Sequence, residues 1–135
     1  MKQAELTTLM EQCAADAVRA ADEQFNVSLD FSKESVSLVD KVLLLFVEQQ
    51  KPETLADDAI FTICNIYGAY TGECYRKLAG GQWRYDESDE KAPYVVLDVG
   101  DKSYAFASIC YERMVNDANV SLARYFELAL NHQLQ

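Results

Sequence analysis

The side chains best placed for chemistry follow an uncharged stretch of fourteen residues, 59–72. Glu73 is the first charge after that stretch, and Arg76 and Lys77 come three and four residues later. In a helix, side chains at these spacings are neighbours. A carboxylate partly removed from water could act as a general acid or base, but we find no second group with a matching role. We therefore expect a structural ion pair, and a carboxylate-dependent hydrolase is a distant alternative.

Two glycines interrupt the same stretch. Gly68 and Gly72 lie about one helical turn apart, and each costs about 1 kcal/mol relative to alanine inside a helix. Glycines on one face allow a helix or sheet to approach the backbone, so we expect a tight packing seam. The alternative is a small-molecule binding domain with a shallow groove floored by the glycines, able to hold a carboxylate or a partner's backbone. The residues of that predicted ligand site are Asn65, Gly68, Gly72, Glu73 and Arg76.

Other catalytic and metal-binding patterns are missing from the sequence. His132 is the only histidine and lies three residues from the end of the sequence. A Cys–His pair, a Ser-His-Asp triad or a histidine-based zinc site could be built only around that position. Gly80 and Gly81 follow a predicted helix, where a nucleotide fingerprint would follow a strand. We expect no catalytic residues, no metal and no cofactor, and an enzyme is the less favoured interpretation.

The four cysteines show no metal or redox spacing. They are scattered through helical apolar patterns, at Cys13, Cys64, Cys74 and Cys110. The N-terminus lacks the features of a signal peptide, and no apolar stretch reaches the ~20 residues of a membrane span. We therefore expect a cytoplasmic protein whose cysteines are reduced and act as small buried hydrophobes.

The charge of the chain is strongly acidic. Twenty-two acids oppose twelve bases, which gives a formal net charge of -10. Lys and Arg provide most of the affinity for phosphate backbones, so nucleic acid is not expected as a partner. An anionic membrane surface is disfavoured for the same reason. Such a charge indicates a soluble acidic protein first, and a basic protein partner is the sharper interpretation.

Tyrosines flank the most acidic segment, residues 86–91, which we expect to be a solvated loop between two strands. Aromatic side chains are enriched in protein interfaces, and here they lie beside carboxylates that would suit a basic partner. The predicted partner-binding residues are Tyr85, Asp86, Glu87, Asp89, Glu90 and Tyr94. The favoured function is a non-catalytic cytoplasmic protein-binding domain, of the immunity or adaptor kind, that engages a basic partner.

Periodicity and capping residues predict helices around these segments. An amphipathic helix is expected over residues 3–24, with an alanine-rich stripe that could pack within the domain or form a homodimer. Asp30 or Ser32 can cap a second helix that ends near Gln49. A third helix is expected from Pro52 to the glycines at 80 and 81. Two closing helices are expected over residues 107–116 and 121–133, the last capped by Asn119 or Ser121.

The segments rich in Trp, Tyr and Val after the third helix predict strands. They cover residues 82–85, 94–99 and 102–106, with a two-residue turn at Gly100 and Asp101. No repeat or linker divides the chain, and 135 residues suffice for one core. We therefore predict a single domain over residues 1–135, of the α+β class, with a helical layer packed on a small three-stranded antiparallel sheet.

Over roughly residues 30–127 the chain resembles a family of small uncharacterised bacterial domains. The shared pattern is D-x-S-x-x-S, then G-A-Y-x-G-E-x-x-R, then G-G-x-W, followed by strands and helices. The matching residues are Asp30, Ser32, Ser35, Gly68, Ala69, Tyr70, Gly72, Glu73, Arg76, Gly80, Gly81 and Trp83. The chain departs from the pattern at Asp117, where such families often have glycine. The resemblance implies an α+β fold and no assigned activity.

Overall fold

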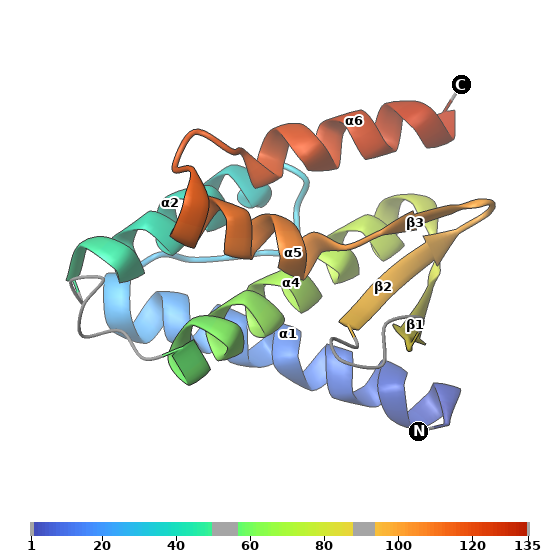
Figure 1. Ribbon diagram of the computed structural model, residues 1–135, viewed down its shortest axis with the longest axis horizontal. Helices are drawn as coiled ribbons and strands as arrows, with labels where there is room; N and C mark the ends of the chain where they lie inside the picture. The colour runs from blue at the N-terminus through green and yellow to red at the C-terminus, as the bar shows by residue number, and fades with distance from the viewer. Residues whose placement is uncertain (1, 50–56, 88–93, 135) are drawn as a thin grey trace.

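The fold is an α+β arrangement in which a long central helix lies among the other helices, with a small sheet toward its C-terminal end (Figure 1). The computed structural model describes residues 2–49, 57–87 and 94–134. In chain order the elements are α1 (Gln3–Phe25), α2 (Ser35–Gln49), α4 (Asp57–Ala79), β1 (Gln82–Asp86), β2 (Tyr94–Val99), β3 (Lys102–Tyr104), α5 (Phe106–Tyr111), the π-helical turn η1 (Glu112–Asn116) and α6 (Leu122–Leu134). The predicted class is confirmed. The predicted start of the third helix at Pro52 lies outside the described residues.

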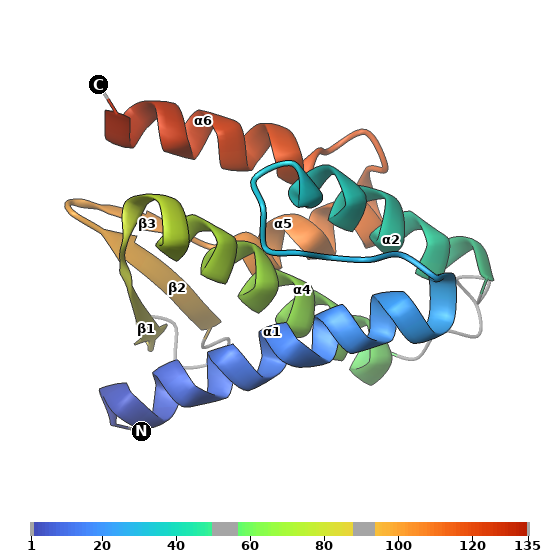
Figure 2. The same ribbon diagram turned by 180° about the vertical axis from the view of Figure 1, so that it is seen from behind.

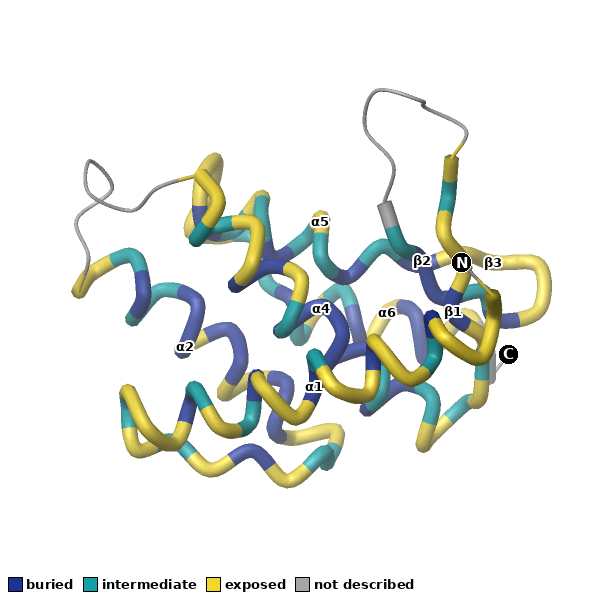
Figure 3. Tube along the Cα trace, turned by 90° about the horizontal axis from the view of Figure 1, so that it is seen from below, coloured by how far each residue is buried: buried dark blue, intermediate teal, exposed yellow. Residues whose placement is uncertain are grey.

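Helix α1 packs along α4 inside the same chain (Figure 2). Its apolar stripe is buried, and the small side chains of Ala14, Ala17 and Ala21 allow a close approach. The hydroxyl of Tyr67 donates a hydrogen bond of 3.0 Å to the carbonyl of Ala17. Of the two predicted uses of this stripe, the structure therefore shows packing within the domain. The opposite face of α1 is exposed (Figure 3).

The connection into α2 is held by α4. The Ser32 hydroxyl accepts a hydrogen bond of 3.1 Å from the Ser35 amide, and the Asp30 carboxylate accepts one of 3.0 Å from the Ser32 amide. Phe31 has a positive φ of 63°, which is strained for a bulky residue. Its amide donates to the Tyr70 hydroxyl at 2.8 Å, and that hydroxyl also lies 2.7 Å from the Ser35 hydroxyl. Tyr70 thus fixes the strained turn.

The sheet has the order β1-β2-β3 with both pairs antiparallel, as predicted. Trp83 pairs with Leu97, and both side chains are buried. Gly100 adopts a φ of 62° in the turn between β2 and β3, which explains a glycine there. The side-chain amide of Gln3 donates to the Trp83 carbonyl at 2.6 Å, so the start of α1 is joined to β1.

The segment after the sheet differs from the prediction. The third strand ends at Tyr104 and helix α5 begins at Phe106, whereas the sequence predicted a strand to residue 106. Phe106 is fully buried among aromatic rings, so its aromatic side chain serves a helix start as well as it would serve a strand. Helix α5 then widens into η1, where the Asp117 amide donates to the Glu112 carbonyl at 2.8 Å.

The carboxylate of Asp40, on α2, caps α6. It accepts hydrogen bonds from the amides of Leu122 and Ala123 at 2.7 and 2.9 Å, and from the Ser121 hydroxyl at 2.9 Å. Ser121 itself caps the Arg124 amide at 3.1 Å, as predicted. The Asp40 carboxylate also lies 3.3 Å from the Arg113 guanidinium. No described helix has the length and apolar character needed to cross a membrane.

Candidate functional site

The face of α4 that carries the two glycines is filled by protein atoms. A methyl group added at Gly68 would lie 2.7 Å from the backbone of Ala107, the second residue of α5. One added at Gly72 would overlap the six-membered ring of Trp83. Both glycines therefore form a packing seam. A ligand in the predicted groove would have to displace α5 or Trp83.

The other predicted ligand residues are not brought together around an open space. Asn65 is exposed, and eleven residues of helix place it about 16 Å along the axis from Arg76. Arg76 turns instead toward the end of its own helix, where its Nε donates to the Gly81 carbonyl at 3.2 Å. That bond holds the glycine turn that leads from α4 into β1.

Glu73 is engaged by two donors. One carboxylate oxygen accepts a hydrogen bond of 2.8 Å from the Arg76 guanidinium and another of 2.8 Å from the indole nitrogen of Trp83. The ion pair with Arg76 is partly buried, and the prediction of a structural ion pair is confirmed. The sequence did not predict the bond to Trp83.

The polar contacts of this cluster are those of a structural link between two elements. Both partners donate to the same oxygen of the carboxylate. A guanidinium and an indole are donors only, and neither exchanges protons at neutral pH. Glu73, Arg76 and Trp83 therefore tie the end of α4 to the first strand.

The described part of the predicted partner site lies at the end of strand β1, just after it, and at the start of β2. Tyr85 has 43% of its surface exposed, and Glu87 is also exposed. Asp86 is partly buried and its carboxylate lies 3.7 Å from the guanidinium of Arg84. Asp89 and Glu90 lie outside the described residues, and Tyr94 is described only as the first residue of β2. Tyr85 and Glu87 thus lie at the surface, whereas Asp86 forms an ion pair with Arg84 on its own strand.

The thiols are buried to different degrees. Cys64, Cys74 and Cys110 are buried and Cys13 is half-buried, and all four are free. Burial raises the pKa of the Cys64 thiol to about 12 and that of Cys74 to about 11, and it raises the pKa of Cys110 well above its usual value. These thiols therefore stay protonated and unreactive at neutral pH.

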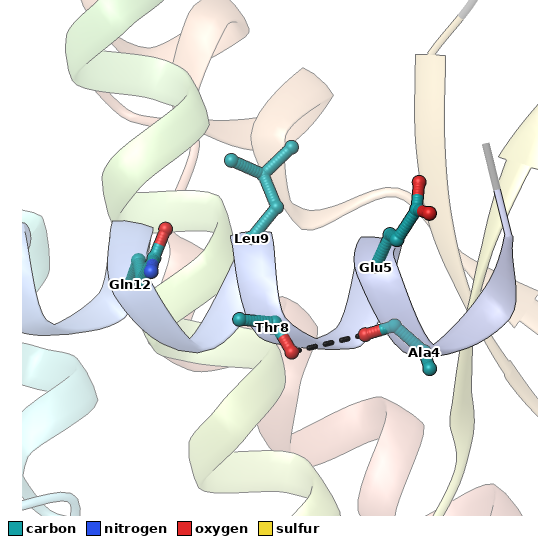
Figure 4. A pocket seen from close by; sticks show the side chains of 5 residues that line it. All are labelled: Ala4, Glu5, Thr8, Leu9 and Gln12. Carbon is teal, nitrogen blue, oxygen red and sulfur yellow. Dashed lines mark hydrogen bonds between the residues drawn. The ribbon is translucent and has the colours of Figure 1, made fainter.

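No group of three or more His, Cys, Asp or Glu side chains in the described ranges is arranged to hold a metal ion. His132 is exposed on α6. One hollow lies along α1, and Figure 4 shows its lining residues: Ala4, Glu5, Thr8, Leu9 and Gln12. All five come from a single helix, and the Thr8 hydroxyl already donates to the Ala4 carbonyl at 3.0 Å. Ligand sites normally converge polar groups from several elements, and this hollow does not.

Sequence reasoning missed an aromatic pair of which one ring is exposed and the other is partly buried. Phe61 on α4 and Tyr111 on α5 stack with ring centroids 5.8 Å apart and planes inclined by 10°. Phe61 lies in the uncharged stretch, where an aromatic residue looks like part of the core, yet 53% of its surface is exposed. Fifty residues separate the two rings, so only the packing of α5 on α4 brings them together.

Comparison of the chain with protein-family models, with curated proteins and with solved structures finds no match.

Proposed function

We propose that this chain is a non-catalytic cytoplasmic protein-binding domain that engages a basic partner, as an immunity or adaptor protein would. The proposal is supported by the acidic charge of the chain and by the character of its polar clusters. The carboxylates of Asp40 and Glu73 are both engaged in joining elements of the fold. The exposed carboxylates remain, and they outnumber the exposed cations among the described residues.

The observation that carries the proposal is the exposure of Tyr85 beside Glu87 at the end of β1. Within the described sheet, β1 pairs with β2 alone, so this strand forms an edge. Exposed tyrosines provide large contact areas at low entropic cost, and they are enriched in interfaces. Carboxylates beside such a ring favour a partner of opposite charge and speed its association.

Co-purification with a tagged protein tests the proposal. The wild type is compared with the double variant Tyr85→Ala/Glu87→Gln, which leaves Asp86 and its ion pair with Arg84 intact. The matched control is Glu127→Gln/Leu128→Ala, which removes an exposed carboxylate and an exposed apolar side chain from α6. A bound protein is identified by mass spectrometry and purified, and its affinity for all three forms is measured.

We expect a basic protein that binds the wild type and the control equally and the Tyr85 variant at least ~10-fold more weakly, since an exposed aromatic anchor and one charge together contribute more than 1.4 kcal/mol. A partner that binds the Tyr85 variant as tightly as the wild type would remove this surface from the interface. A specific partner with net negative charge would refute the proposed function.

A further inference from the structure

Two buried, sulfur-containing side chains lie close in the chain to the stacked pair Phe61 and Tyr111. Three residues after Phe61, Cys64 is buried, and three residues after Tyr111, Met114 is buried. The Cys64 and Met114 sulfur atoms lie 3.9 Å apart. Buried side chains of α4 and η1 thus lie close in the chain to the two rings, while 53% of the Phe61 surface remains exposed to solvent.

Three exposed carboxylates lie close to this pair in the chain. Asp57 and Asp58 lie in the first turn of α4, four and three residues before Phe61, which is the spacing of neighbouring side chains on a helix. Both are exposed, and neither forms an ion pair with a cation in the described part of the chain. Glu112 is exposed next to Tyr111. The surface thus combines aromatic rings with carboxylates that form no ion pair within the described ranges.

Tyr111 is held in place because hydrogen bonds fix the π-helical turn η1, which follows it directly. The Arg113 guanidinium donates to the carbonyls of Ala118 and Val120 at 2.7 and 2.6 Å, and its Nε donates to the Asp40 carbonyl at 3.0 Å. Val115, one turn beyond Tyr111, is 44% exposed and extends the apolar surface. A surface ordered before binding loses little conformational entropy when a partner docks.

We propose that Phe61 and Tyr111, with Asp57 and Asp58 beside them, form a docking surface for an arginine side chain of the basic protein partner. This inference rests on the proposed function and adds a second contact to the one at Tyr85. A guanidinium is planar, stacks on aromatic rings and pairs with carboxylates, whereas a lysine ammonium is a compact charge that is more strongly hydrated. The arrangement therefore selects arginine over lysine.

The test uses two synthetic peptides, octa-arginine and octa-lysine, titrated into the full chain and followed by NMR and by calorimetry. We expect octa-arginine to bind more tightly than octa-lysine and to shift the ring resonances of Phe61 and Tyr111. Phe61→Leu keeps an apolar side chain but removes the ring, and it weakens octa-arginine binding about fivefold. Its control is Leu78→Ala, which alters an equally exposed residue near the other end of α4.

Two further variants test the contribution of the carboxylates. Asp57→Asn/Asp58→Asn is expected to weaken binding of octa-arginine more than Asp22→Asn/Glu23→Gln, which neutralises two adjacent exposed acids on α1. Equal affinities of octa-arginine for wild type and Phe61→Leu would overturn this inference. Shifts confined to Tyr85 and Glu87 would also overturn it but would leave the proposed function intact. If neither peptide bound the wild type, both proposals would fail.

Discussion

Arg84 lies between two carboxylates on the exposed side of the sheet. Its Nε donates to Asp98 at 2.7 Å, and the Ser103 hydroxyl donates to the other oxygen of Asp98 at 2.6 Å. The hydrogen bond from Arg84 is the largest cause that lowers the pKa of Asp98 below its ordinary value, and the bond from Ser103 adds to it. Ionic contacts of Arg84 thus hold the strands close to the proposed partner surface on β1. The arrangement of these residues therefore depends on pH.

The lowered pKa of Asp98 predicts a specific acid sensitivity. A carboxylate whose pKa is lower in the folded state stabilises the fold above its unfolded-state pKa of about 4, and that stabilisation is lost as the pH falls through the folded-state value. Asp98→Asn should therefore lower the free energy of unfolding at pH 7 and make it fall less between pH 5 and pH 2.5. Urea unfolding across this range measures both effects. Asp101→Asn, at the exposed turn, is the control, and an acid dependence of Asp98→Asn identical to that of wild type would contradict the assignment.

Helix α4 is the element that organises the molecule, and its two glycines meet different neighbours. Gly68 allows the start of α5 to approach the helix backbone, and Gly72 allows the ring of Trp83 to lie flush against it. At the next residue, the Glu73 carboxylate accepts a hydrogen bond from the same indole. Trp83 is therefore held against the helix by close packing and by a hydrogen bond. The residues most suggestive of a site in the sequence are therefore the ones that join α4 to β1 and α5.

The variant Gly68→Ala tests whether the cost of overpacking exceeds the gain in helix propensity at this position. Alanine is the better helix former by about 1 kcal/mol, but its methyl group would lie 2.7 Å from the backbone of Ala107, which cannot yield as a flexible side chain would. Overpacking of a core costs about 1 to 3 kcal/mol, so we expect a net loss of about 1 kcal/mol or more in the free energy of unfolding. Asn65→Ala, on the exposed side of the same helix, should be neutral or slightly stabilising. A Gly68→Ala protein more stable than wild type would show that α5 does not pack closely there.

At the scale of the whole molecule, one buried carboxylate joins three separate segments. Asp40 on α2 caps the first turn of α6 and pairs with Arg113 in η1, so it fixes both closing elements to the second helix. Figure 1 shows α6 and α2 lying on the same side of α4, with α5 beside them. This contact also sets the position of the turn that supports Tyr111 and Val115.

Asp40→Ala should therefore be one of the most damaging single changes in the chain. It removes the acceptor of the first amides of α6 and the carboxylate partner of the partly buried Arg113 guanidinium, which keeps only its carbonyl acceptors. Breaking a buried pair in this way costs about 3 to 5 kcal/mol. Chemical denaturation measures the loss in the free energy of unfolding. Asp117→Ala removes an exposed carboxylate from the same connection and should cost less than about 1.5 kcal/mol. Equal losses for the two variants would mean that Asp40 does not join these segments.

Local patterns in the sequence predicted the secondary structure, while the contacts that matter most are distant in the chain. Apolar periodicity gave α1 nearly to its ends, and the glycine turn at Gly100 was correctly placed. Nothing in the local sequence distinguishes Asp40 from the other acids, because the groups that it caps in α6 lie more than eighty residues away and are brought to it only by folding. The stacking of Phe61 on Tyr111 escaped prediction for the same reason. The ion pair of Glu73 was predictable because its partner is three residues away in one helix.

The affinity of the isolated complex at different salt concentrations tests the central claim, that an acidic surface of this domain engages a basic partner. The measurement is the dissociation constant of the wild type with its co-purified partner, at constant pH, from about 50 mM to about 500 mM salt. Screening of exposed charges predicts that the complex weakens by ~10-fold or more over this range. A dissociation constant that stays the same across the range would contradict the claim.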